Sequence, residues 1–278
     1  MSDSISAATA PTLCFLLGIL QRSGTNFLSS LLVLHPQIIG PGPIWEDFLL
    51  HESDLLRDYV DKVYGHWNSE WDIARKVGPQ ERLLQSLGDA LQGFLRLQGS
   101  LREPGRMRLT KTPSVKGLRN FAALFPEAKL IVLVRDGRAV VESGVRSFGW
   151  EYDNAARQWA EAARLILQCV HEHTVACERF LLVRYEDLVV DLRNQLLRVL
   201  SFLGLDNSVY PFEAAGKLQV IGSSDLVGKE GVVHWKGTAK DETFKPLERF
   251  SEWDAARHAS FNRIAGPEMA ELGYDILR

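Results

Sequence analysis

The chain is poor in the residues and patterns that mark several protein classes. Its 278 residues include only 3 cysteines without a C-x-x-C pair, which excludes a cysteine-rich zinc site and a disulfide scaffold. The first apolar run, 13–20, is too short to span a membrane and follows no basic segment. These absences predict a cytoplasmic protein with neither a signal sequence nor a membrane anchor.

An excess of charge of one sign is also missing. The 32 Lys and Arg residues against 35 Asp and Glu residues give a formal net charge of -3, which argues against nucleic acid as a partner. The length and the 46% apolar content allow one large α/β domain. We expect a single domain over 1–278 with a loose polar lead-in at 1–11, and nothing indicates the oligomeric state.

Strand and helix patterns alternate along the chain. Four segments predict strands, at 13–20, 106–110, 129–134 and 180–184. Helical spacing marks the segments 27–34, 55–63, 83–95, 115–125, 137–147, 153–176, 191–203 and 254–272, the last broken or kinked at Gly266-Pro267. The alternation predicts a doubly wound, mainly parallel sheet flanked by helices. Residues 205–250 lack a sustained period, which predicts a long functional loop.

A glycine-containing turn at 18–26, Gly-Ile-Leu-Gln-Arg-Ser-Gly-Thr-Asn, separates the first strand from the first helix. Backbone N–H groups and a helix N-terminus at such a turn form an anion site. Gly24 allows close approach of the backbone, and Arg22 supplies a forked positive charge. The side-chain donors are Ser23, Thr25 and Asn26. The alternative is that Ser-Gly-Thr only caps the helix.

This turn differs from the nucleoside-triphosphate loop G-x-x-x-x-G-K-[ST]. Its glycines are six residues apart, and Gly24 is followed by Thr25 instead of lysine, which counts against a Mg²⁺-nucleotide site. Asp136 nevertheless follows a strand in the manner of a metal-binding acid. A Mg-ATP-dependent small-molecule kinase therefore stays as an alternative, and a non-catalytic nucleotide-binding module is a third hypothesis.

Four motifs follow one another in the order 22–26 (RSGTN), 133–143 (LVRDGRAVVES), 184–188 (RYEDL) and 234–237 (HWKG). In this order they resemble the sulfotransferases that use 3′-phosphoadenosine 5′-phosphosulfate (PAPS), with a P-loop type of nucleotide-binding fold. The first motif resembles their 5′-phosphosulfate loop, the second their 3′-phosphate segment, and the fourth a late loop that closes over the cofactor. The Arg-Ser-Gly-Thr form is most similar to the tyrosylprotein and the bacterial or polyketide-associated branches.

The resemblance implies a set of residues that bind PAPS and its product, 3′-phosphoadenosine 5′-phosphate (PAP). They are Arg22, Ser23, Gly24, Thr25, Asn26, Arg135, Ser143, Tyr185, Trp235, Lys236 and Gly237. Arg135 ends a strand where open α/β sheets bind ligands, and with Ser143 it is expected to hold the 3′-phosphate. The alternatives are a surface ion pair for Arg135, a packed aromatic for Tyr185, and a solvated Lys236 beside a buried Trp235.

Sulfuryl transfer moves an SO₃ group in line to an acceptor oxygen, with negative charge growing on the leaving oxygen. Catalysis then consists of positioning and electrostatic stabilisation, and the chemistry requires no metal. We expect Arg22 to stabilise the leaving phosphate and Lys111 to reach the sulfonate. Glu46 is the expected base, with His234 as its rival. A solvated loop acid and a solvated lysine are the alternatives for Glu46 and Lys111.

The expected acceptor is a hydroxyl of a small molecule, as in natural-product biosynthesis, with neither nucleic acid nor membrane as a partner. Several aromatic residues are candidates for an acceptor pocket or for ordinary core packing. They are Trp45, Trp67, Trp71, Phe148 and Trp150.

Overall fold

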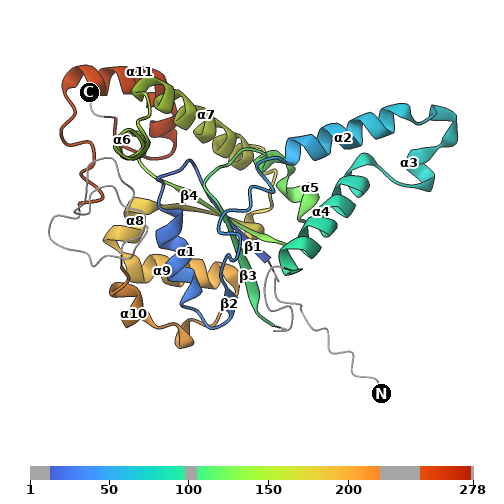
Figure 1. Cartoon of the computed structure of the whole chain (residues 1–278), viewed down its shortest axis with the longest axis horizontal. Helices are drawn as coiled ribbons and strands as arrows, with labels where there is room; N and C mark the ends of the chain where they lie inside the picture. Colours follow the sequence, from blue (N-terminus) through green and yellow to red (C-terminus); the bar gives the residue numbers. More distant parts are fainter. Residues whose placement is uncertain (1–12, 98–104, 220–244, 277–278) are drawn as a thin grey trace.

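The alternating pattern builds one parallel sheet in the computed structural model, which describes residues 13–97, 105–219 and 245–276 (Figure 1). The strands of this part of the chain are β1 (Leu13–Gly18), β2 (Ile38–Ile39), β3 (Met107–Thr112), β4 (Lys129–Val134) and β5 (Phe180–Arg184). Their order is β2-β3-β1-β4-β5, and every neighbouring pair is parallel. The predicted α/β fold with a doubly wound sheet is confirmed.

β1 lies at the centre of the sheet, and all six of its residues are buried. Its alternate side chains enter two different apolar layers, because successive residues of a strand point to opposite faces. Phe15 belongs to one layer and Leu16 to the other. In the register, Leu16 stands between Lys111 of β3 and Ile131 of β4. The strands therefore end at a common carboxyl edge.

Helices cover both faces of the sheet, as a doubly wound topology requires. The layer that contains Phe15 includes residues of α4 (Gln80–Leu97), α5 (Phe121–Leu124), α6 (Gly137–Phe148), α7 (Tyr152–His171) and α11 (Ala255–Glu271). The layer that contains Leu16 includes residues of α1 (Thr25–Val33), α8 (Tyr185–Val190) and α9 (Leu192–Leu203).

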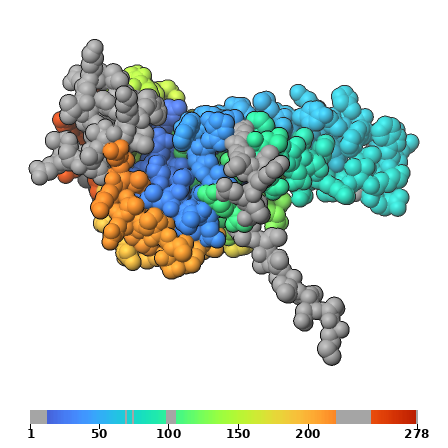
Figure 2. Space-filling view, turned by 60° about the horizontal axis from the view of Figure 1, so that its bottom comes forward, coloured from blue at the N-terminus to red at the C-terminus, as the bar shows by residue number. Residues whose placement is uncertain are grey.

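Two further parts extend this framework. α2 (Ser53–His66), α3 (Ile73–Lys76) and α4 form an arm that projects away from the sheet, as Figures 1 and 2 both show. α10 (Phe212–Gly216) packs with α1 and α9 in a small third cluster around Leu31 and Tyr210. No helix of the described part is long and apolar enough to cross a membrane.

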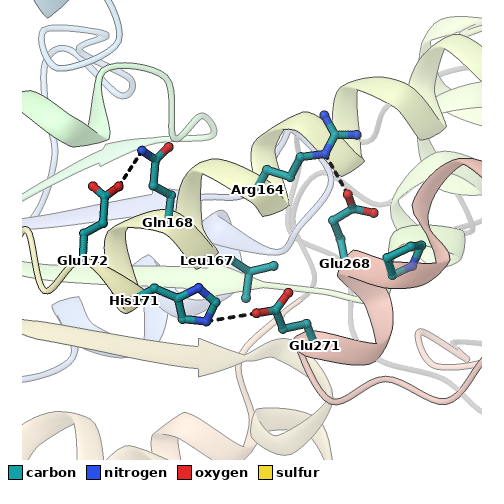
Figure 3. Close-up of a pocket in the computed structure, with 8 residues that line it drawn as sticks. Arg164, Leu167, Gln168, His171, Glu172, Glu268 and Glu271 are labelled. Carbon is teal, nitrogen blue, oxygen red and sulfur yellow. Dashed lines mark hydrogen bonds and ion pairs between the residues drawn. The ribbon is translucent and has the colours of Figure 1, made fainter.

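α7 and α11 pack along each other and line an open groove of about 430 Å³ (Figure 3). Two ion pairs cross this groove. Arg164 Nε lies 2.7 Å from Glu268 Oε1, and His171 Nε2 lies 2.9 Å from Glu271 Oε1. These contacts attach the last helix to the layer that covers β4.

The helix predicted at 115–125 is wrong for most of its length. The segment contains a 3-10 turn at Leu118–Asn120 and the single turn of α5. Gly117 explains the difference, because its φ of 77° is left-handed and a Cβ atom there would lie 2.0 Å from the main-chain oxygen of Leu50. A left-handed residue interrupts a right-handed helix, and the contact with Leu50 leaves room for glycine but not for a side chain at this position.

Other boundaries differ less. β2 and α8 were not predicted, and the helix expected at 153–176 ends at His171. α11 is one continuous helix in spite of Pro267. The loop expected at 205–250 begins with a 3-10 turn at Asn207–Val209 and α10, while 220–244 and the lead-in 1–11 lie outside the described residues. The single domain stays a prediction.

Candidate functional site

The turn after β1 is closed by hydrogen bonds within itself and to β4. The N–H group of Ile19 donates to the carbonyl of Leu133 at 3.0 Å, which continues the strand pairing past Gly18. Ser23 donates twice to the carbonyl of Leu20, at 3.3 Å from its N–H group and at 2.7 Å from its hydroxyl. The predicted role of Ser23 as an anion donor therefore stays a prediction that requires these bonds to be exchanged.

Both the backbone conformation and the packing at Gly24 require glycine. Its φ of 98° is left-handed, and a Cβ atom there would lie 2.5 Å from the ring of Tyr185. Gly24 also precedes α1 and gives it no side-chain cap. The first N–H groups of a helix lack partners inside the helix, so these groups stay available to a ligand. The alternative that Ser-Gly-Thr serves only as a cap loses its support.

Arg22 connects the turn to α6. Its Nε donates to Ser143 Oγ at 3.0 Å, although the two residues are 121 positions apart in the sequence. Its guanidinium also lies 5.5 Å from the centre of the Phe148 ring. The structure thus brings together the residues assigned to the 5′-phosphosulfate loop and to the 3′-phosphate segment.

Arg135 extends from the end of β4 into the same turn. Its Nη1 donates to the carbonyl of Arg22 at 2.8 Å, and its Nη2 donates to the carbonyl of Pro246 at 2.6 Å. The guanidinium lies 4.4 Å from the centre of the Tyr185 ring. Arg135 is only 5% exposed, and its buried Nε has no hydrogen-bond partner among the described residues.

The alternative of a surface ion pair for Arg135 would use one of the nearby acids, Asp136 or Glu142, but both bind other residues. Asp136 pairs with Arg138 at 2.6 Å, and Glu142 pairs with Arg146 at 2.6 Å. Within the described ranges no ion pair joins Arg135 to an acid. A buried guanidinium held by neutral carbonyls is the arrangement that an anion completes.

Lys111 lies within β3 and is 3% exposed, so it is not a solvated lysine. Its Nζ donates to Asn26 Oδ1 at 2.7 Å and to Glu46 Oε1 at 2.9 Å. Three segments therefore meet at this ammonium group: the start of α1, the end of β3, and the loop before α2. Glu46, with a side chain 33% exposed, is the acid that faces the turn from this loop.

The neighbouring acid, Asp47, has a different environment. Its Oδ1 accepts a 2.9 Å hydrogen bond from the N–H group of Leu49. Burial raises the pKa of Asp47, while hydrogen bonds from Leu49 and Thr110 and the charge of Lys111 act in the opposite direction. Asp47 fixes the loop that presents Glu46.

The predicted ligand residues that the structure describes converge at the carboxyl ends of β1, β3 and β4, the edge where open α/β sheets bind ligands. The converging side chains and backbone groups come from Arg22, Ser23, Gly24, Thr25, Asn26, Glu46, Lys111, Arg135, Ser143 and Tyr185. His234, Trp235, Lys236 and Gly237 lie outside the described residues. Across the described ranges, no group of three or more His, Cys, Asp or Glu side chains is placed to hold a metal ion.

Two contacts of this site were not predicted from the motifs. The carbonyl of Pro246 reaches Arg135 from the loop predicted at 205–250, but no motif distinguishes this residue. Trp159 Nε1 donates to the carbonyl of Arg135 at 3.2 Å from the middle of α7, where its spacing indicates only a core residue.

Of the aromatic residues considered for an acceptor pocket, Phe148 contacts a residue of the candidate site. It is 44% exposed, and its ring lies against the guanidinium of Arg22. Trp150 packs against Gly144 and lies 5.7 Å from Phe148 between ring centres. Trp45, next to Glu46 in the sequence, is 70% exposed. Trp67 packs on Tyr64 at 4.5 Å between ring centres, and Trp71 is 52% exposed at the end of the 3-10 turn that follows α2.

Comparisons with known proteins agree with this architecture. The model of a family described as the sulfotransferase family matches residues 14–208. The chain is 28% identical over 277 residues to protein-tyrosine sulfotransferase 1 of Danio rerio, and the alignment covers 93% of this chain and 71% of that protein. It is 26% identical over 279 residues to protein-tyrosine sulfotransferase 2 of Gallus gallus, with 93% and 68% covered.

Two solved structures share the fold. The sulfotransferase domain from the curacin biosynthetic pathway gives a TM-score of 0.59 at 23% identity and covers 96% of this chain and 99% of that one. The sulfotransferase domain from the Synechococcus PCC 7002 olefin synthase gives 0.55 at 23% identity, with 98% of each chain covered. At this identity the likeness concerns the arrangement of the sheet and its helices.

Proposed function

Since the chain belongs to the sulfotransferase family, we propose that it transfers a sulfuryl group from PAPS to a hydroxyl group of a small molecule. The family and the enzyme class inferred from the four motifs are confirmed, as is PAPS as the donor at the level of the family. The observation that carries the proposal for this chain is the convergence of Arg22, Lys111 and Arg135 on one glycine turn.

The roles follow from where each group lies. PAPS supplies the activated SO₃ group and leaves as PAP. Arg22 and the N–H groups at the start of α1 are placed to stabilise negative charge on the 5′-phosphate. Arg135 and Ser143 are placed for the 3′-phosphate, and Tyr185 packs beneath Gly24 and Arg135 as their support.

Glu46 and Lys111 form the acceptor side of the site. Lys111 carries a buried positive charge that suits a developing sulfonate charge, and Glu46 carries the carboxylate that accepts the hydroxyl proton. In the structure these two groups are paired with each other. Glu46 acts as a base after Lys111 Nζ moves from Glu46 to the sulfonate. The rival base, His234, stays a hypothesis for mutagenesis.

A kinase is disfavoured by the surroundings of Asp136. Its carboxylate accepts bonds from the backbone and the side chain of Arg138, so it is not presented to a metal ion. The turn also lacks the lysine that follows the glycine in nucleoside-triphosphate loops.

A thermal-shift comparison of PAP, ADP and ATP, each with and without Mg²⁺, tests the nucleotide part of the proposal. A ligand that binds only the folded protein raises the melting temperature. We expect the largest increase with PAP and no requirement for Mg²⁺. Stabilisation by ATP with Mg²⁺ alone would support the kinase instead.

The acceptor requires a separate experiment, because the two curated relatives are named for protein tyrosine and the two solved domains for biosynthetic assemblies. Radiolabelled sulfate transfer from PAPS is measured with a panel of small alcohols and phenols. A tyrosine-containing peptide and its phenylalanine counterpart are assayed in parallel. Transfer to the small hydroxyl compounds supports the proposal, and transfer to the tyrosine peptide alone makes a protein the acceptor.

The three cysteines are free thiols, with Cys14 and Cys169 buried and Cys177 exposed. Free thiols suit a reducing compartment, so a cytoplasmic location is proposed with the function. Fluorescence microscopy of a tagged full-length protein in its own cells tests this location.

A further inference from the structure

Glu186 is a partly buried acid at the start of α8, and both of its carboxylate oxygens have partners. Oε1 accepts a 2.9 Å hydrogen bond from the N–H group of Asp136, the residue that follows Arg135. Oε2 accepts a 3.0 Å hydrogen bond from the hydroxyl of Tyr274, near the C-terminal end of the described chain. Neither contact is part of the phosphate site itself.

The backbone of residues 135–137 is held by a side chain at each of its three positions. Trp159 of α7 donates to the carbonyl of Arg135, and Glu186 accepts from Asp136. The N–H group of Gly137 faces Met269 Sδ of α11 at 3.4 Å. Side chains from α7, α8 and α11 therefore fix the backbone of residues 135–137, which carries the side chain of Arg135.

The fixed backbone at 135–137 matters because the guanidinium of Arg135 makes two contacts at once. Its guanidinium must lie on the face of Tyr185 and at hydrogen-bond distance from the carbonyl of Arg22 at the same time. Forked recognition of a phosphate tolerates displacements of only about 0.5 Å. A change in the backbone at Asp136 is therefore transmitted directly to this guanidinium.

The electrostatics of Glu186 point in the same direction. Burial raises its pKa, while the N–H group of Asp136 and the positive charge of Arg135 act to lower it. A buried acid costs stability through desolvation. The favourable interactions of Glu186 are with the N–H group of Asp136 and with the charge of Arg135.

Tyr274 completes the support. It is buried, its hydroxyl donates to Glu186, and the guanidinium of Arg184 lies 4.3 Å from the centre of its ring. The hydroxyl of Tyr274 thus orients the carboxylate of Glu186 toward the N–H group of Asp136. Without the hydroxyl, the Glu186 side chain loses one of its two anchors.

We propose that Glu186, oriented by Tyr274, is a positioning residue that holds Arg135 in register for the 3′-phosphate of the nucleotide. This role rests on the proposed function, because it presumes that Arg135 binds that phosphate. It adds to that function a link between the last segment of the chain and the selectivity of the site.

The first test compares the affinities of Tyr274→Phe for PAP and for AMP, which differs from PAP only by lacking the 3′-phosphate, by titration calorimetry. We expect the preference for PAP to fall about tenfold with AMP affinity nearly unchanged. Tyr210→Phe is the matched control, because Tyr210 is also buried and its hydroxyl donates to the carbonyl of Leu31 at 2.8 Å, away from the turn. This control is expected to lower the melting temperature and to keep the preference for PAP.

A double-mutant cycle separates positioning from general loosening. If Tyr274 acts through Arg135, Tyr274→Phe has no further effect on the PAP preference in an Arg135→Ala background. Equal weakening of PAP and AMP by Tyr274→Phe, or an undiminished effect in the Arg135→Ala background, would overturn the inference. A wild-type protein without any preference for PAP over AMP would instead overturn the proposed function, and the positioning role with it.

Glu186→Gln supplies an independent variant. Glutamine keeps an oxygen for the N–H group of Asp136 but removes the negative charge and the acceptor for Tyr274. We expect a loss of PAP preference at least as large as that of Tyr274→Phe. A PAP preference equal to that of the wild type in both variants would contradict the proposal.

Discussion

Arg135 Nη1 donates a 2.8 Å hydrogen bond to the main-chain oxygen of Arg22, and this bond joins the end of β4 to the turn after β1. The two residues are assigned to opposite ends of the same nucleotide, one to its 3′-phosphate and one to its 5′-phosphosulfate. The shared bond means that the two anion sites are built as one unit.

The first prediction concerns Arg135→Ala. The variant removes the guanidinium from the site proposed for the 3′-phosphate, and charged hydrogen bonds of this kind contribute about 1.5–3 kcal/mol each. We expect PAP affinity to fall about 100-fold and the affinity for AMP, which differs from PAP only by the 3′-phosphate, to fall less than about 10-fold. Titration calorimetry with both nucleotides measures the difference. Equal losses for PAP and AMP would remove the argument for 3′-phosphate recognition.

The second prediction separates the candidate bases. Glu46→Gln keeps an oxygen for the hydrogen bond from Lys111 Nζ and removes the carboxylate, so PAP affinity is expected to change little while turnover falls about 100-fold or more. Single-turnover sulfate transfer measures the chemical step.

Two further variants serve this experiment. Asp47→Asn is the matched control on the same loop. Asparagine keeps an oxygen for the N–H group of Leu49, so the loop is retained and we expect turnover within about threefold of the wild type. His234→Ala is measured in parallel. A chemical step slowed by His234→Ala and unaffected by Glu46→Gln would transfer the role of base to His234.

The third prediction is a pH dependence of stability through Glu142. This acid accepts hydrogen bonds from Trp253, Tyr152 and Arg146. Burial alone raises the pKa of Glu142, but these bonds outweigh it and hold the pKa below the usual value of 4.5. A lowered pKa in the folded state adds stability that is complete above pH 4.5 and is lost as the pH falls through the folded value.

Glu142→Gln measures this contribution. We expect the variant to be less stable than the wild type by about 1–3 kcal/mol at pH 7. Urea unfolding followed from pH 7 to pH 3 should show the two proteins approaching each other below the usual carboxyl pKa. A difference in unfolding free energy that stays constant over this range would contradict the assignment.

The sheet and the glycine turn after β1 could be predicted from the sequence because both depend on local patterns. Runs such as the one over 129–134 are buried on both faces, and Gly24 immediately precedes α1 in the turn that follows β1. The positions of Arg135 and Ser143 beside the turn followed from the rule that parallel strands end at one edge.

Long-range contacts account for what the sequence did not indicate. The helix expected at 115–125 is interrupted because Gly117 is left-handed where it packs against the carbonyl of Leu50, which belongs to a distant segment. The pairing of Lys111 with Glu46 likewise depends on how the loop before α2 folds back over β3. Neither contact has a local pattern, so only the folded chain reveals them.

The last prediction concerns Gly24→Ala. A methyl group at this position meets a left-handed φ and the ring of Tyr185, since the added Cβ would lie 2.5 Å from that ring. We expect a loss of about 1–3 kcal/mol in unfolding free energy, together with a loss of most of the stabilisation by PAP, because the turn must move away from Tyr185. Gly93→Ala is the matched control. Gly93 lies inside α4 with no atom within 4 Å of an added Cβ, so alanine there should stabilise the protein by about 0.5–1 kcal/mol. Thermal and urea unfolding with and without PAP measure both effects, and a Gly24→Ala protein that binds PAP as the wild type does would show that the turn does not form the phosphate site.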